Sequence, residues 1–153
     1  MKQNRNGILV FLLIALTACQ SATPLPRVLI TDNTEFTLAP NQEATIVSTG
    51  LVVTLLGVTS DGRCPSEIEC AESGPVSLSL LVQIGNGEAN EIYLQTFTDY
   101  EGRAPSMQFE GIENRIVYEG YVFQVAGVSP YPTNLEEPIK DSEYRVTLIV
   151  TQE

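Results

Sequence analysis

An apolar residue occupies every second position of residues 76–84, which read VSLSLLVQI. A period of two is typical of a β-strand, in which successive side chains point to opposite faces, and it does not fit the 3.6-residue period of a helix. We therefore expect a strand with one buried face, and its inward side chains are Val76, Leu78, Leu80, Val82 and Ile84. Gly85-Asn86-Gly87 then predicts a hairpin turn, and the return strand is expected at residues 91–98.

Similar alternation or short apolar runs recur along the chain, and no stretch combines a helical stripe with helix caps. The other predicted strands are 35–38, 44–47, 51–58, 115–118, 121–128 and 143–151. About eight short strands separated by Gly, Pro and Asn turns predict an all-β, antiparallel two-sheet sandwich with an immunoglobulin-like layout, and a barrel is the alternative. Because functional residues concentrate on loops, we expect a site among the three long connections, residues 59–75, 99–106 and 129–142.

The first eighteen residues have the three parts of a secretory signal. Lys2 and Arg5 give a positive start, and an uncharged apolar stretch follows at residues 7–16. Leu16-Thr17-Ala18-Cys19 then resembles a lipobox, in which small residues precede a cysteine that receives a diacylglyceryl group and becomes the first residue after cleavage. The alternative is an ordinary signal peptide with a cysteine near its cleavage site.

A lipobox at this position fixes the domain organisation that we expect. Residues 1–18 would be the lipoprotein signal peptide, residues 19–27 the acylated Cys19 with a tether rich in proline, and residues 28–153 a single β-sandwich domain. Each buried CH₂ of an acyl chain contributes about 0.8 kcal/mol, so two or three chains hold a protein firmly at a bilayer. The predicted location is therefore the extracytoplasmic side of the cell envelope, with the lipid bilayer as a partner.

The composition disfavours several classes of function. The formal net charge is −11, and removal of Lys2 and Arg5 with the signal peptide would make the mature domain still more acidic, so nucleic acid is not an expected partner. The chain has no histidine, which is the usual general base and the commonest zinc ligand. Its 15 glutamates are scattered along the sequence, and no two of them stand out as a catalytic pair. We therefore expect that the protein is not an enzyme and that it binds no cofactor or metal.

Two cysteines remain after Cys19, at positions 64 and 70. An even pair in an exported protein predicts a disulfide, here closing a short loop. The C-x₅-C spacing differs from the C-x-x-C of redox motifs, and two sulfurs without histidine make a poor zinc site.

The same loop resembles a group of uncharacterised bacterial lipoproteins and secreted β-domains that carry D-S-R-C-P followed by C-x-W-A-G. Asp61, Arg63, Cys64 and Pro65 match the first element, whereas Gly62 replaces its serine. In the second element Cys70 and Gly74 match, but Glu72 replaces the tryptophan and Ser73 the alanine. The group also tends to end in V-x-P-Y-P and a Y-x-V-x-L-x-V strand, which match Val128, Pro130, Tyr131, Pro132, Tyr144, Val146, Leu148 and Val150. The resemblance implies a small β domain of unassigned function.

Four residues of these motifs are candidates for a recognition loop: Asp61, Arg63, Pro65 and Tyr131. The structural alternative is that Arg63 pairs with Asp61 or Glu67 to fix the loop and that Tyr131 covers a core edge. We expect a non-enzymatic binding or structural module of the envelope, with a protein or a polymer as its possible partner. The alternative is a loop-presented inhibitor of an extracellular hydrolase; calcium binding at Asp61, Glu67, Glu69, Glu72, Asp99 and Glu101 and a carboxylate-based hydrolase are weaker hypotheses.

Overall fold

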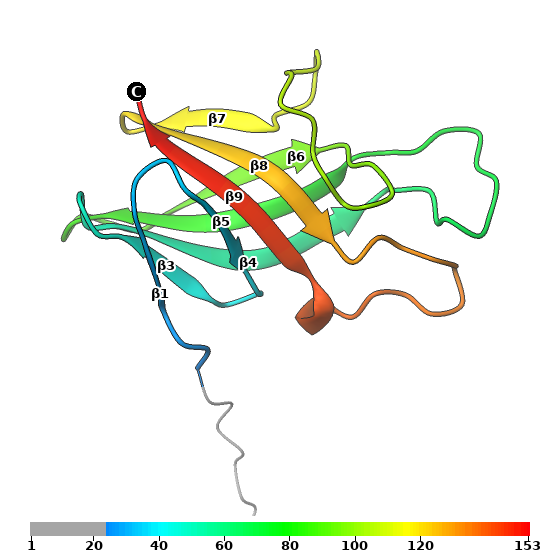
Figure 1. Ribbon diagram of the computed structural model, residues 1–153, viewed down its shortest axis with the longest axis horizontal. Helices are drawn as coiled ribbons and strands as arrows, with labels where there is room; N and C mark the ends of the chain where they lie inside the picture. Colours follow the sequence, from blue (N-terminus) through cyan, green and yellow to red (C-terminus); the bar gives the residue numbers. More distant parts are fainter. Residues whose placement is uncertain (1–23) are drawn as a thin grey trace, which may run out of the picture.

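The computed structural model describes residues 24–153, in which the clean alternation of residues 76–84 forms strand β5, an interior strand of its sheet (Figure 1). Cys19 and the predicted signal peptide lie outside the described residues. The strands are β1 Val28–Ile30, β2 Glu35–Leu38, β3 Glu43–Ile46, β4 Leu51–Asp61, β5 Val76–Ile84, β6 Asn90–Thr96, β7 Arg115–Tyr118, β8 Tyr121–Ser129 and β9 Arg145–Gln152, with one short 3₁₀-helix, η1, at Asp141–Glu143.

The strands form two packed sheets, which confirms the predicted two-sheet sandwich. A five-stranded sheet has the order β1-β3-β4-β5-β6, and a four-stranded sheet has the order β2-β9-β8-β7. The order of the strands within each sheet was not predicted from the sequence. Here β3 to β6 are consecutive antiparallel neighbours in one sheet, and β7 to β9 are consecutive in the other.

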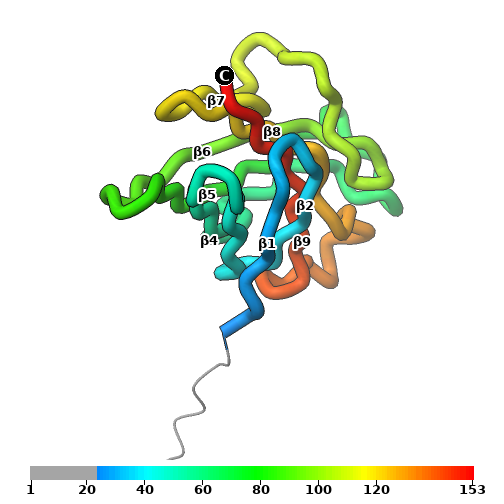
Figure 2. Tube along the Cα trace, turned by 60° about the vertical axis from the view of Figure 1, so that its left-hand side comes forward, coloured from blue at the N-terminus to red at the C-terminus, as the bar shows by residue number. Residues whose placement is uncertain are grey.

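The beginning of the domain is the exception to this simple order. The chain runs through β1 in the first sheet, crosses to the second sheet as β2, and returns as β3 (Figure 2). Because it reverses direction twice, β1 and β3 run the same way and form a parallel pair, with Val28 opposite Ala44. Strand β1 was not predicted from the sequence, because a run of only three residues carries little periodic pattern. Contacts of the domain begin even earlier, since the Gln42 amide donates to the carbonyl oxygen of Pro26.

The core lies between the sheets and follows the period-two pattern of the sequence. Leu78, Leu80 and Leu94 have no exposed surface, and neither have Phe123 and Leu148 from the facing sheet. The alternation in β5 and β9 therefore identified the buried face correctly, including Tyr144 immediately before β9.

Candidate functional site

Three long connections gather at one end of the sandwich, on the right in Figure 1. We call this region the loop end; it comprises residues 62–75, 97–114 and 130–144. Each follows a strand that belongs to the core, so the starting point of each loop is fixed by the packing of the sheets. The predicted recognition residues lie in or next to this region.

Arg63 is the residue that joins the three connections. Its side chain has no exposed surface, although arginine is among the residues least often buried. The guanidinium donates to both carboxylate oxygens of Asp61, from Nε at 2.8 Å and from Nη2 at 2.6 Å. Nη1 donates to the Val128 carbonyl at 2.9 Å and, more weakly, to the Thr98 hydroxyl at 3.4 Å, and Nη2 also donates to the Pro130 carbonyl at 3.0 Å.

These contacts use all five N–H groups of the guanidinium, which is the condition under which a buried charge is tolerated. They also reach residues that are distant in sequence, because Thr98 lies in the second loop, Pro130 lies in the third, and Val128 lies on β8 just before the third loop. Arg63 therefore fixes the relative positions of the three loops.

The electrostatics around Asp61 follow from this arrangement. Partial burial would raise the pKa of the Asp61 carboxyl, but hydrogen bonds and charge from Arg63 outweigh it and hold that pKa below its usual value. The Tyr144 hydroxyl donates to the same carboxylate at 3.1 Å. Burial, together with the negative charge of Asp61, raises the pKa of Tyr144 to about 12. Near neutral pH, Tyr144 is therefore neutral and Asp61 is ionised beside the guanidinium.

An aromatic pair covers the outer side of Arg63. The Tyr131 ring lies 5.0 Å from the guanidinium carbon, within the range of a cation–π contact. The Tyr100 ring lies 5.1 Å from Tyr131, at an interplanar angle of 59°. Tyr131 is half-buried, whereas Tyr100 is 72% exposed, so the stack runs from the buried cation to the surface. We call Asp61, Arg63, Tyr131 and Tyr144 the Arg63 cluster.

The predicted disulfide is present between Cys64 and Cys70. The loop that it closes is paired to its neighbour through the backbone, since the amides of Ser66 and Glu67 donate to the carbonyls of Pro132 and Thr133 at 3.0 and 2.9 Å. The disulfide and these hydrogen bonds therefore hold the first loop against the third.

Two glycines allow the second loop to dock on β8. The backbones of Gly102 and Gly127 approach so closely that a Cβ on Gly127 would lie 2.8 Å from the Gly102 carbonyl oxygen, and one on Gly102 would lie 2.5 Å from the Val128 carbonyl oxygen. Gly102 also has a φ of 81°, which favours glycine. The approach permits hydrogen bonds from Val128 to Gly102 and from Ala104 to Ala126.

The structure brings Asp61, Arg63 and Tyr131 together, as the motif suggested, but in a supporting position. Arg63 and Pro65 are buried, so neither side chain projects from the surface, and both line a small cavity at the loop end. Arg63 pairs with Asp61, which was one of the two structural alternatives, and not with Glu67.

The exposed apolar side chains of the loop end were not identified from the sequence. They are Ile68, Tyr100, Met107, Phe109 and Leu135, and they come from all three loops. A small cavity of about 180 Å³ lies at the loop end; its lining includes the apolar residues Pro65, Pro132, Leu135, Pro138 and Ile139 and the polar residues Asp61, Arg63, Asn134 and Tyr144. No periodic pattern marks these positions, because irregular loops have no fixed alternation of buried and exposed residues.

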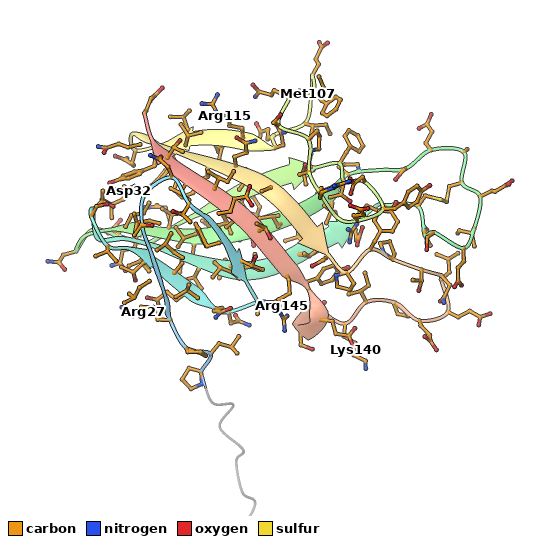
Figure 3. All side chains as sticks on the ribbon, in the orientation of Figure 1. Arg27, Asp32, Met107, Arg115, Lys140 and Arg145 are labelled. Atoms are coloured by element: carbon orange, nitrogen blue, oxygen red, sulfur yellow. A yellow bond between two sulfur atoms is a disulfide. The ribbon has the colours of Figure 1, made fainter. Side chains whose placement is uncertain are left out.

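Charged groups are distributed unevenly over the domain. The basic residues Arg27, Arg115, Lys140 and Arg145 lie at separate places on the periphery (Figure 3). The carboxylates named as calcium candidates lie on the first two loops, but within residues 24–153 no group of three or more Asp, Glu, Cys or His is placed to hold a metal ion.

No family model, curated protein or solved structure matches this chain. The resemblance to uncharacterised lipoproteins therefore stays a prediction from the motif. Across the described residues, no helix has the length and apolar character needed to cross a membrane.

Proposed function

We propose that this chain is a lipid-anchored protein of the bacterial cell envelope, and that its β-sandwich is a non-enzymatic module that binds a protein partner through the loop end. The observation that carries the proposal is the combination of a fully hydrogen-bonded, buried Arg63 with exposed apolar side chains on the three loops that it fixes.

Rigid loops favour binding because little conformational freedom is lost when the partner arrives. The Arg63 cluster and the disulfide hold the loops in place before any partner is present. Tyr100 and Leu135 then offer apolar surface, and the cavity beside Leu135 has room for a small apolar side chain. Large apolar side chains exposed together are typical of interaction sites.

The charge of the loop end indicates the chemistry of the partner. Glu67, Glu69 and Glu72 lie on the first loop, and Glu136 and Glu137 lie on the third. Carboxylates around an apolar centre favour a partner whose apolar contact is surrounded by Lys or Arg, because complementary charges speed association and exclude wrong partners.

The inhibitor hypothesis has no comparable support. It rested on the loop that the disulfide stiffens, and the one cleavage-like residue beside that loop, Arg63, has a buried and fully engaged side chain. We therefore do not develop it as a second function.

The anchor is supported by the lipobox-like residues Leu16 to Cys19. Fewer than ten residues separate Cys19 from Pro26, where contacts with the domain begin, and an extended chain spans about 3.3–3.6 Å per residue. The domain would therefore sit within a few tens of ångströms of the bilayer.

Mass spectrometry of membrane-extracted protein tests the anchor. We expect an N-terminal peptide that begins at Cys19 and carries acyl chains, and we expect Cys19→Ser to release a folded domain from the membrane. An unmodified residue 19 in membrane-extracted protein would contradict the lipid anchor and leave the binding proposal to its own test.

Site-specific photo-crosslinking in cells tests the binding surface. A photoreactive residue at Tyr100 or Leu135 should yield a discrete adduct with one partner. The matched controls are Val47 and Val117, which are also exposed apolar residues but lie outside the loop end. Equal adducts from all four positions, or none from Tyr100 and Leu135, would refute the loop end as the binding surface.

A further inference from the structure

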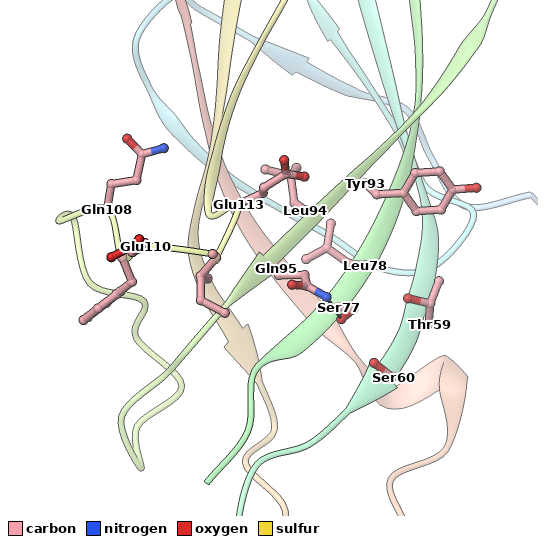
Figure 4. Close-up of a pocket in the computed structure, with 13 residues that line it drawn as sticks. Thr59, Ser60, Ser77, Leu78, Tyr93, Leu94, Gln95, Gln108, Glu110 and Glu113 are labelled. Carbon is pink, nitrogen blue, oxygen red and sulfur yellow. Dashed lines mark hydrogen bonds between the residues drawn. The ribbon is translucent and has the colours of Figure 1, made fainter.

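A polar groove lies on the outer face of the five-stranded sheet, away from the core (Figure 4). Its volume is about 810 Å³, towards the upper end of the roughly 300–1,000 Å³ typical of ligand sites. Gln108 and Glu110 stand on one side in Figure 4, Tyr93, Thr59 and Ser60 stand on the other, and Gln95 and Ser77 lie between them.

The floor of the groove is a row of small and polar side chains across three adjacent strands. Ser60 of β4 is opposite Ser77 of β5, and Ser77 is opposite Gln95 of β6. The Gln95 amide nitrogen donates to the Ser77 hydroxyl at 3.0 Å. This bond orients the amide and leaves its oxygen without a hydrogen-bond partner among residues 24–153, so that oxygen is able to accept from a ligand.

The loop wall of the groove is held in place by its own contacts. The Phe109 ring meets Phe97 edge-on at 5.6 Å, and the buried Asn114 amide donates to the carbonyls of Pro105 and Met107. The backbone amide of Gln95 donates to the Glu113 carbonyl at 2.9 Å, which ties the end of this wall to β6. The groove is thus formed by the folded chain itself.

The opposite wall provides an aromatic surface. Tyr93 lies on β6 two residues before Gln95, so both side chains are on the same face of the sheet. Tyr93 is 56% exposed. Its neighbours across the strands are Ser79 and, beyond it, Gly57, which are too small to cover the ring. An exposed aromatic ring beside fixed polar groups suits a ligand that has both an apolar face and hydroxyl groups.

The charges of the lining residues exclude several ligand classes. Glu110 and Glu113 line the groove, and no lysine or arginine among residues 24–153 does. Phosphate, sulfate and other anionic groups would be repelled there. An extended peptide normally binds through an unpaired strand edge or through side-chain pockets. The floor of this groove instead consists of the faces of β4, β5 and β6, and the edge of β6, the last strand of the sheet, is bonded at Gln95 to the loop wall.

We propose that this groove binds an uncharged polysaccharide chain. The Tyr93 ring would stack on the C–H face of a sugar, while Gln95 and Ser77 on the floor and Gln108 and Glu110 on the wall would form hydrogen bonds with its hydroxyls. The groove shares residues 108–113 with the second loop of the loop end, but its floor and Tyr93 lie on the sheet face, away from Tyr100 and Leu135.

The test uses the full chain, extracted in detergent, against a panel of uncharged glycans that includes cellulose, chitin, xylan and mixed-linkage glucans. We expect retention on at least one insoluble glycan and measurable calorimetric binding of its soluble oligosaccharides. Tyr93→Ala and Gln95→Ala should each weaken that binding about tenfold. Both variants should melt near the wild-type temperature, because neither side chain belongs to the core.

Tyr100→Ala is the matched control, since it removes an exposed tyrosine from the loop end and not from the groove. It should leave glycan binding unchanged and reduce crosslinking at the loop end. Failure of every uncharged glycan to bind would overturn the proposal, as would unchanged binding by Tyr93→Ala. Binding to peptides or to anionic polymers alone would overturn it as well, and none of these results would bear on the loop-end partner.

Discussion

The two ends of the sandwich connect their strands in different ways. At the end opposite the loop end, the connections have no more than five residues. We call it the hairpin end; it comprises residues 31–34, 47–50, 85–89 and 119–120. Every one of these turns contains a residue with a positive φ: Asn33, Gly50, Gly85, and the pair Glu119 and Gly120. The loop end has long connections, and their positions depend on Arg63, the disulfide and the docking of Gly102 on β8.

This difference separates local from long-range determination of structure. A short turn is specified by the residues within it, because one left-handed residue decides the direction of the chain. The loop end is specified by contacts between segments more than sixty residues apart in sequence, such as Arg63 with Val128 and Pro130. Substitutions should therefore have local effects at the hairpin end and cooperative effects at the loop end.

Removal of the Arg63 side chain should have the largest effect. Arg63→Ala leaves the Asp61 carboxylate and the carbonyls of Val128 and Pro130 without their buried donor. We expect a loss of about 3–5 kcal/mol in the free energy of unfolding, measured by urea denaturation. Arg63→Lys should restore only part of this loss, because an ammonium group cannot make the forked contacts of a guanidinium.

Arg103→Ala is the matched control for this experiment. Arg103 also pairs with carboxylates at the loop end, through Asp99 and Glu101, but its side chain is 70% exposed. Its removal should change stability by less than about 1 kcal/mol. Similar losses for the two variants would show that the buried cluster is not what holds the loop end together.

Loss of the disulfide should have the next largest effect. Replacement of both Cys64 and Cys70 by alanine should cost about 2 kcal/mol, because the closed loop is short and its closure removes little entropy from the unfolded chain. A reducing agent should lower the stability of the wild type by a similar amount and leave the double variant unaffected. Equal sensitivity of both proteins to reduction would contradict this interpretation.

The sequence predicted the hairpin end and the core well and the loop end poorly, for physical reasons. The alternation of residues 76–84 and the Gly85-Asn86-Gly87 turn are signals carried within a few positions, and the structure follows both. The Cys64–Cys70 disulfide was also predicted, from the even number of cysteines left after Cys19 and the predicted export. In contrast, the burial of Arg63 depends on carbonyls of Val128 and Pro130, which no local pattern marks. The strand order was missed for a related reason, because pairing between distant strands such as β2 and β9 is not encoded within either strand.

The hydroxyl of Tyr144 should contribute less to the free energy of unfolding than the disulfide does, and its contribution should depend on pH. Tyr144→Phe removes the hydrogen bond to Asp61 and should cost about 1–2 kcal/mol near neutral pH. The raised pKa of Tyr144, about 12 against an ordinary value of 10.0, means that the unfolded chain loses this proton before the folded one. The wild type should therefore lose stability as pH rises from 10 towards 12, whereas Tyr144→Phe lacks this contribution.

The difference in unfolding free energy between wild type and Tyr144→Phe should accordingly be constant from pH 6 to 9 and narrow above pH 10. Tyr100→Phe, at an exposed position, should track the wild type at every pH. A difference that stays constant or widens above pH 10 would show that the Tyr144 hydroxyl is not held by Asp61.

The smallest effect is expected at the hairpin end, at Gly85. Its φ is 54°, and a Cβ added there would meet nothing within 4 Å, so Gly85→Ala introduces backbone strain without a clash. Strain of this kind at a single left-handed residue costs about 1 kcal/mol. Asn86→Ala, one residue further in the same turn, is the control and should stay within about 0.5 kcal/mol of the wild type.

Because the turn lies at the end of the sandwich opposite the loop end, the near-UV circular dichroism of the Tyr100–Tyr131 stack should be the same in Gly85→Ala and wild type, while Arg63→Ala should alter it. A change of that signal in Gly85→Ala would mean that the two ends are coupled through the sheets, and the distinction between a locally specified end and a cooperatively specified end would then be wrong.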